Sequence, residues 1–172
     1  MSASPAWYCS EGGWPSPNGK AVTEVFYVLE GYGSLEDADG FQHYFGPGDN
    51  VIIPKGHTGR WDVNGPIRKV WAVNAHENIE ETSNPIRVQV DHYNSWATQF
   101  LTPNEDGNDP LYGDVLEATA MSFSKTFYDV GPTKVGVWSS EPGSYNVSRG
   151  RRAWIHVLEG VAFVTNGMDG SS

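Results

Sequence analysis

Residues 24–61 read EVFYVLEGYGSLEDADGFQHYFGPGDNVIIPKGHTGRW, and this stretch decides the fold. Residues 24–30 are rich in β-branched and aromatic side chains and end at Gly31, which predicts a strand closed by a glycine turn. The Asp39-Gly40 pair favours positive backbone angles and predicts a hairpin tip. The return and the strands after it are predicted at residues 33–35, 41–45 and 50–53. Short strands between closely spaced glycine turns are typical of an all-β sandwich or barrel.

The flanking sequence continues this pattern on both sides. Residues 10–20 predict a loop because Gly and Pro are dense there, and residues 64–66, Asn-Gly-Pro, predict a turn between two strands. Residues 75–87 lose the alternation and predict a connecting segment. Outside the central stretch, strands are predicted at residues 6–9, 58–63, 67–73, 115–128 and 134–138.

Composition and charge restrict the classes of function. The chain of 172 residues carries a formal net charge of −10, which argues against nucleic acid and anionic membrane surfaces as partners. Cys9 is the single cysteine, so no disulfide can form within the chain. The sequence starts without the basic and apolar segments of a signal peptide, and no apolar run is long enough to span a bilayer. We therefore expect a cytoplasmic protein with a small-molecule ligand.

Residues 24–61, followed by PIRKVW at residues 66–71, closely resemble the cupin superfamily. Within that superfamily, the similarity is to the branch that contains ureidoglycine aminohydrolase and the ethanolamine-utilisation cupins. The resemblance covers about residues 7–75 and returns more weakly later in the chain. It implies an RmlC-like jelly roll, which is a double-stranded β-helix with a pocket in the mouth of the barrel.

An internal repeat relates the two ends of the chain. The VLEG at residues 28–31 recurs at residues 157–160, an offset of 129 residues. The SEGG at residues 10–13 has a counterpart, SEPG, at residues 140–143, an offset of 130 residues. Because the offset is nearly constant, we interpret the chain as part of a two-cupin protein.

This interpretation predicts the domain organisation. We expect a near-complete cupin barrel in residues 1–75, a linker in residues 76–96 and a partial second cupin repeat in residues 97–172. The late strands are expected to complete the barrel, either within the chain or by strand exchange in a homodimer. A repeat left incomplete would expose apolar side chains such as Val157 and Phe163.

The resemblance also implies a metal site, which in cupins takes two His and a Glu from the first motif and a His from the second. Glu24 stands at the glutamate position, but residues 17–20, where the two His are expected, contain none. Gly59 stands at the position of the last His. One carboxylate does not hold a transition metal tightly, so no cofactor is expected. Mn²⁺ or another divalent metal on replacement ligands, Glu24 and His57, stays open as the alternative.

Five residues are candidates for the ligand site. Phe26 shares the face of Glu24 on a predicted strand, and both should face the barrel interior. His43 follows the alternation of the phenylalanines beside it and is expected to point inward, although a hydrogen-bonded, partly buried structural histidine is the simpler interpretation. Trp61 lies on the same face of its predicted strand as Gly59, which predicts its indole at the pocket wall, and packing in the core explains the pattern equally well. His57 is a candidate acid–base group together with Glu24, although a solvent-exposed loop histidine is the simpler interpretation.

Two functions of different classes follow, and whether the protein is an enzyme stays open. The first is a metal-poor cupin that binds a small polar metabolite in the barrel mouth. The second, implied by the resemblance, is a Mn-dependent enzyme similar to ureidoglycine aminohydrolase, with Glu24 and His57 near the ion. The missing histidines favour the first function. A weaker third possibility is a structural oligomerisation module with Trp7, Tyr8 and Trp14 at its interface.

Overall fold

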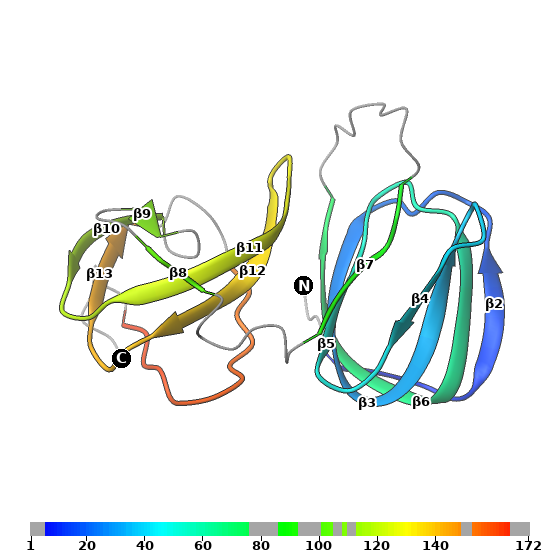
Figure 1. The fold of residues 1–172 in the computed structure, drawn as a ribbon, viewed down its shortest axis with the longest axis horizontal. Coiled ribbons are helices and arrows are strands. Elements are labelled where there is room, and N and C mark those ends of the chain that lie inside the picture. Colours follow the sequence, from blue (N-terminus) through cyan, green and yellow to red (C-terminus); the bar gives the residue numbers. More distant parts are fainter. Residues whose placement is uncertain are drawn as a thin grey trace.

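A computed structural model describes residues 6–75, 86–92, 101–104, 108–109, 113–148 and 153–165. Within these ranges every regular element is a β-strand, which confirms the all-β prediction. The strands form one seven-stranded sheet and two three-stranded sheets (Figure 1). Over the same ranges, no helix has the length and apolar character needed to cross a membrane.

The seven-stranded sheet curls into a barrel (Figure 1). Its strands are β1 (Ala6–Cys9), β2 (Gly12–Ser16), β3 (Thr23–Asp37), β4 (Gln42–Phe45), β5 (Asp49–Ile53), β6 (Gly59–Asn74) and β7 (Gln89–His92). Their order is β1-β6-β3-β5-β7, with β2 paired to β6 and β4 paired to β3. The two longest strands, β3 and β6, pair antiparallel from Thr23 opposite Asn74 to Asp37 opposite Gly59. This long ladder holds the functional side chains described below.

β3 runs through Gly31, so the predicted glycine turn at this residue is wrong. Gly31 has a φ of 82° and lies where the pairing with β6 shifts register, between Glu30 and Tyr32. A Cβ atom at Gly31 would collide with the carbonyl oxygen of Pro66, so this bulge requires a glycine. The turn predicted at residues 64–66 is also wrong, because β6 is continuous there and bends opposite the bulge.

Other turns follow the sequence more closely. Gly40 has a φ of 84° at the tip of the hairpin between β3 and β4, as predicted, and its amide donates to the carbonyl oxygen of Asp37 at 2.9 Å. The edge strand predicted at residues 6–9 is confirmed as β1. The loop expected at residues 10–20 contains β2, and the linker expected at residues 76–96 contains β7. β2 pairs with β6 and β7 pairs with β5, and this pairing outweighs the local sequence signals for a loop.

The core lies on the inner face of the barrel. The buried cluster comprises Phe26, Val28, Leu35, Phe45, Val51, Ile53, Trp61, Val63, Ile67 and Val88. On β6 every second residue from Trp61 to Lys69 is buried, as the alternation of a strand requires. This periodicity places a charged side chain, that of Lys69, on the same face as the core.

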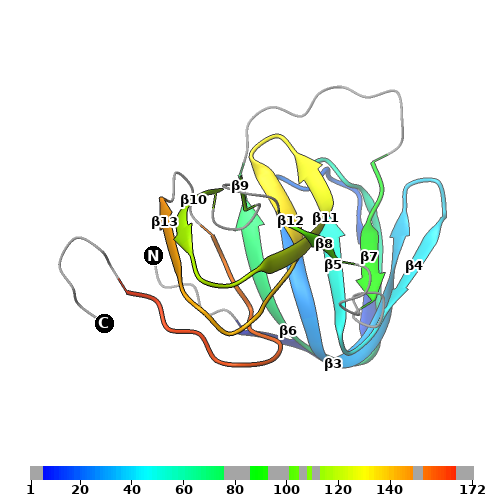
Figure 2. The same ribbon diagram turned by 60° about the vertical axis from the view of Figure 1, so that its left-hand side comes forward.

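The late strands pair with one another. They are β8 (Thr102–Pro103), β9 (Asn108–Asp109), β10 (Gly113–Ala118), β11 (Ser122–Val130), β12 (Thr133–Ser140) and β13 (Tyr145–Ser148). They form two sheets, in the orders β13-β10-β9 and β12-β11-β8 (Figure 2). Among the strands that the structure describes, no late strand joins the seven-stranded sheet. The assignment of residues 97–172 to a partial second cupin repeat, and the completion of the barrel by these strands, stay predictions.

Side chains link the late strands to the barrel. Nδ2 of Asn74 donates to Oγ1 of Thr133 at 2.7 Å, and Nε2 of Gln89 donates to the carbonyl oxygen of Phe127 at 2.8 Å. Residues 153–165, where the repeat predicts a strand, form none. Most apolar side chains of this segment are exposed, including Val157 at 54% and Phe163 at 93%.

Candidate functional site

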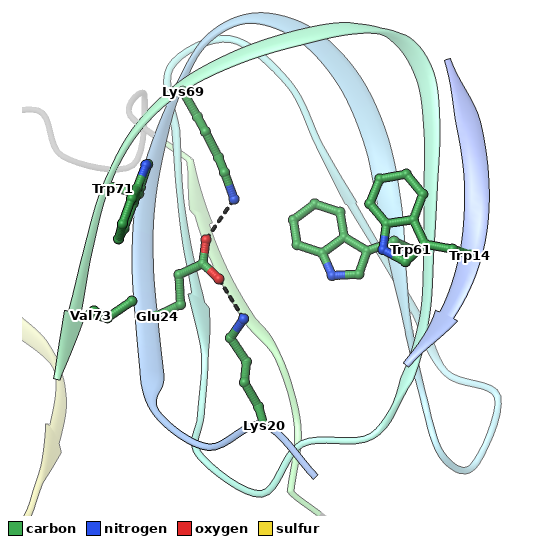
Figure 3. A pocket seen from close by; sticks show the side chains of 7 residues that line it. All are labelled: Trp14, Lys20, Glu24, Trp61, Lys69, Trp71 and Val73. Atoms are coloured by element: carbon green, nitrogen blue, oxygen red, sulfur yellow. Dashed lines mark hydrogen bonds and ion pairs between the residues drawn. The ribbon is translucent and has the colours of Figure 1, made fainter. Parts of the chain in front are cut away.

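A pocket of about 300 Å³ opens inside the barrel. Its walls come from β2, from the turn before β3, from β3 itself and from β6. The residues that line it are Trp14, Lys20, Glu24, Trp61, Lys69, Trp71 and Val73 (Figure 3). Charged and aromatic side chains therefore converge on one cavity, which is the usual composition of a small-molecule site.

Glu24 lies at the centre of the charged side chains. Its Oε1 accepts from Nζ of Lys69 at 2.6 Å, and its Oε2 accepts from Nζ of Lys20 at 2.5 Å (Figure 3). The Lys69 side chain is 5% exposed, that of Glu24 is 12% exposed and that of Lys20 is 26% exposed. Two ammonium groups thus share one carboxylate, and the site carries one excess positive charge. We call these three residues the Lys-Glu-Lys cluster.

The backbone fixes each member of the Lys-Glu-Lys cluster in place. Glu24 pairs with Ile53 of β5 and Val73 of β6, so its strand is held from both sides. The amide of Lys20 donates to the carbonyl oxygen of His57 at 3.0 Å, and its carbonyl oxygen accepts from the amide of Gly56 at 2.7 Å. The turn after β5 therefore positions Lys20 over the same pocket that Glu24 enters from β3.

Burial and charge shift the pKa values of the buried pair. Burial raises the pKa of Glu24, but the ammonium groups of Lys69 and Lys20 outweigh it and hold that pKa below its usual value. Burial lowers the pKa of Lys69; the Glu24 carboxylate opposes this effect, and the charge of Lys20 adds to it. Lys69 therefore shares the Glu24 carboxylate with a second ammonium group. The environment therefore favours the carboxylate form of Glu24 and makes Lys69 easier to deprotonate than an exposed lysine.

Aromatic rings form the floor and one wall of the pocket. The rings of Trp14 and Trp61 stack with centroids 5.9 Å apart at 11°, and Phe26 lies behind Trp61 at 5.7 Å and 25°. Nζ of Lys69 lies 4.0 Å from the Phe26 ring centroid and 4.9 Å from that of Trp61. These contacts place the ammonium group in apolar surroundings with the π faces as partial compensation.

The structure brings together only some of the predicted site residues. Glu24 and Trp61 line the pocket, and Phe26 is fully buried beneath it. His43 and His57 lie elsewhere, around the carboxylate of Asp37. His57 is buried, so the interpretation as a solvent-exposed loop histidine is wrong: its ring is drawn inward by the buried acceptor.

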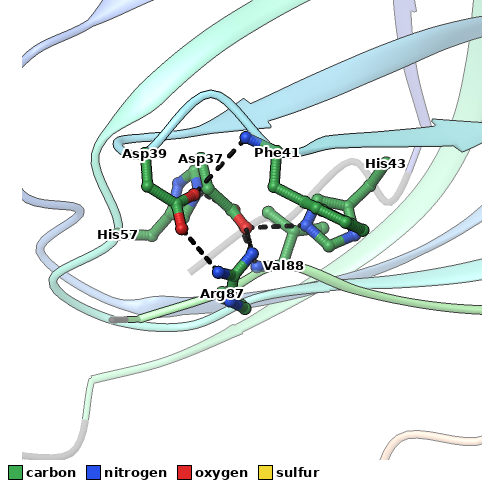
Figure 4. Close-up of polar contacts among 7 residues, drawn as sticks. All are labelled: Asp37, Asp39, Phe41, His43, His57, Arg87 and Val88. Carbon is green, nitrogen blue, oxygen red and sulfur yellow. Dashed lines mark hydrogen bonds and ion pairs between the residues drawn. The ribbon is translucent and has the colours of Figure 1, made fainter. Parts of the chain in front are cut away.

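Asp37 is the centre of a second polar cluster (Figure 4). Its Oδ2 lies 2.7 Å from Nε2 of His43, and its Oδ1 lies 2.9 Å from Nε2 of His57. The amide of Val88 donates to Oδ1 at 3.1 Å, and Nη1 of Arg87 lies 3.4 Å from Oδ2. Burial raises the pKa of Asp37, but hydrogen bonds from His43, Val88 and His57 outweigh it and lower that pKa. This cluster fastens the segment before β7 to the end of β3.

Five lining residues were not among the predicted site residues: Trp14, Lys20, Lys69, Trp71 and Val73. Two signals in the sequence could have found the lysines. Lys20 stands within residues 17–20, where the family places its two histidines. An even number of positions separates Lys69 from Trp61 along β6, so the two side chains point to the same face of the strand. Trp14 was missed because β2 was taken for a loop.

The donor set of the pocket does not fit the divalent metal that the family implies. Both carboxylate oxygens of Glu24 are bound to ammonium groups, and Lys20 occupies the stretch where histidines are expected. Two cations beside the single carboxylate would repel a metal ion. Over the ranges that the structure describes, no three His, Cys, Asp or Glu side chains lie close enough together to hold a metal.

Comparisons with known proteins place these features in a family. Residues 1–71 match the family of EutQ-like cupin domains. A DUF861 family protein from Thermotoga maritima is 30% identical in a match that covers 41% of this chain and 77% of that protein, with a TM-score of 0.38. YhaK from Escherichia coli is 11% identical over 71% of this chain and 54% of its own, with a TM-score of 0.41. No curated protein matches the chain. The family match, together with 30% identity over more than two thirds of the Thermotoga protein, shows that the chain belongs to the cupin superfamily.

Proposed function

We propose that this cupin binds a small organic anion with a flat apolar body in the tryptophan-lined pocket. The observation that carries the proposal is the excess positive charge of the Lys-Glu-Lys cluster between aromatic walls. The whole chain has a net charge of −10, so a cationic cavity within it is a local exception. Anion binding uses that charge, and aromatic stacking uses the indole rings.

The two lysines support different parts of this function. Lys20 is the more exposed, so its ammonium group can turn from Glu24 toward a ligand carboxylate at the pocket opening. Lys69 is nearly covered and holds Glu24 in place from the inside. A ligand ring would lie near Trp61, Trp14 or Trp71, all of which line the cavity.

The Mn-dependent alternative has no support from the site. A catalytic metal needs several neutral or anionic donors with an open position. The pocket offers one carboxylate, already bound by two cations. The interface proposed for Trp7, Tyr8 and Trp14 also gains no support, because Trp14 faces the pocket and the side chain of Trp7 lies outside the described residues. Homodimer formation and a cytoplasmic location stay predictions, and light scattering tests the first.

Isothermal titration calorimetry with 4-(hydroxymethyl)benzoate tests the proposal. This probe carries a carboxylate and a flat ring, and we expect a Kd on the order of 1 mM or tighter. Lys20→Met should weaken binding about tenfold, the usual loss for one charge-assisted hydrogen bond. Lys134→Met is the matched control, because Lys134 pairs with Asp129 outside the pocket at 3.0 Å. Absence of measurable binding, or equal binding by both variants, would refute the proposal.

A further inference from the structure

Lys69 has three properties that a lysine in a purely structural ion pair does not require. Its amine is buried on the inner face of β6, it lines a cavity, and it shares its counter-ion with a second lysine. We propose that Nζ of Lys69 forms a Schiff base with the carbonyl carbon of a ligand held in this pocket. The inference rests on the proposed function, since the same pocket holds the ligand.

The geometry suits an amine nucleophile. The pocket reaches Lys69, so a carbonyl carbon in the cavity has access to its Nζ. The Lys69 side chain is only 5% exposed, and this burial favours the neutral, nucleophilic amine, although the Phe26 and Trp61 rings at 4.0 and 4.9 Å offset part of the effect. A neighbouring cation acts in the same direction, and Lys20 supplies one across the shared carboxylate.

Glu24 can carry the protons that the step requires. Its Oε1 lies 2.6 Å from Nζ of Lys69 and accepts the ammonium proton. The free amine then attacks the carbonyl carbon, forming a C–N bond and a carbinolamine. Glu24 returns its proton to the carbinolamine hydroxyl, which leaves as water. The balance is one carbonyl and one ammonium group converted to one protonated imine and one water, with no oxidant or reductant involved.

The rest of the pocket defines the class of carbonyl compound. Lys20 offers its ammonium group to a carboxylate, and Trp61 and Trp14 offer flat apolar surface. A cavity of about 300 Å³ accommodates a molecule of roughly ten to fifteen heavy atoms, at about 20 Å³ each. We therefore infer an aldehyde or ketone with an aromatic or other flat body and a carboxylate.

Reductive trapping on the full chain tests this inference. The protein is incubated with 4-carboxybenzaldehyde and cyanoborohydride, digested, and mapped by mass spectrometry. We expect one carboxybenzyl group per chain, located on Lys69, while Lys134 at the surface stays largely unmodified. Lys69→Arg should lose the adduct without creating a new one. Because the mapping is done on the unaltered protein, the result does not depend on whether that variant folds.

The alcohol used above, 4-(hydroxymethyl)benzoate, separates the two proposals because it has no aldehyde or ketone group that could form a Schiff base. Binding of the alcohol with no adduct at Lys69 would overturn the Schiff base and leave the proposed function standing. Modification spread equally over Lys69 and Lys134 would also overturn it, because the reaction would then show no site. If the alcohol fails to bind and no adduct forms at Lys69, both proposals fall.

Discussion

Glu24→Gln tests the electrostatics of the pocket most directly. The substitution keeps the shape of the side chain but removes the one carboxylate among the residues that line the cavity. Lys20 and Lys69 then face each other with no negative charge between them. Lys69 is 5% exposed and has little access to water, so most of the lost stability comes from the removal of the carboxylate beside its buried ammonium group.

The expected loss follows from the burial of the partners. Removing one member of a buried ion pair costs about 3–5 kcal/mol. Lys20 is 26% exposed and can recover hydration, so we expect Glu24→Gln to lower the free energy of unfolding by about 2–3 kcal/mol while the fold persists. Lys69→Met is the contrasting variant. It leaves Glu24 paired with Lys20 and puts an apolar side chain against Phe26, so its free energy should stay within about 1 kcal/mol of the unaltered protein.

Urea unfolding, followed by far-UV circular dichroism, measures these differences. Glu30→Gln is the matched control, because Glu30 accepts from Arg68 at 2.6 Å on the exposed side of the same strand. Such an exposed pair contributes about 1 kcal/mol or less. If Lys69→Met destabilised the protein as much as Glu24→Gln does, the view that Lys69 depends on Glu24 more than Glu24 depends on Lys69 would be refuted.

Three further predictions concern the bulge, the second polar cluster and metal content. Gly31→Ala should lower the free energy of unfolding by about 2 kcal/mol or more, while Gly40→Ala, also at positive φ but with open space around it, should lose only about 1 kcal/mol in the same urea assay. The pKa of Asp37 is lowered on folding, so its contribution is present above its ordinary value of 3.8 and is lost as the pH falls through the folded value. In Asp37→Asn, the free energy of unfolding should therefore fall less steeply as the pH drops below 3.8. An unchanged slope of stability against pH in acid would contradict this. Protein purified without chelator should carry well under one equivalent of transition metal per chain. If elemental analysis found close to one equivalent, the conclusion that the pocket does not fit a divalent metal would be wrong.

The sequence predicts the strands of the barrel better than their continuity. The runs at residues 24–30 and 50–53 are strands because β-branched and aromatic residues fill them. Gly31 and residues 64–66 were assigned to turns because glycine at positive φ serves a turn and a bulge equally well. Only the partner strand distinguishes the two, since the close approach of Pro66 to Gly31 depends on pairing between residues far apart in sequence.

The candidate site, too, could be predicted only in part from the sequence. Parity along β3 and β6 predicts that Glu24 and Trp61 face inward, and both line the pocket. The same alternation predicts that His43 points inward, but its ring forms a hydrogen bond with the carboxylate of Asp37. Local alternation gives the face of a side chain and leaves its hydrogen-bond partner undetermined. His57 was misjudged for this reason, because its buried partner comes from the far end of β3.

The proposed anion site draws its positive charge from lysines rather than from a metal ion. A metal cupin has neutral imidazoles, one carboxylate and a divalent cation, which together carry one positive charge. The Lys-Glu-Lys cluster carries the same charge, because two ammonium groups replace the metal ion around the same glutamate position. The two arrangements differ in what they offer a ligand. A metal polarises an oxygen of the ligand as a Lewis acid, whereas Lys69 presents a nitrogen that can form a bond to carbon. In the two proposals, the Lys-Glu-Lys cluster therefore offers amine–carbonyl condensation in place of metal-assisted chemistry, and its excess positive charge attracts an anionic ligand.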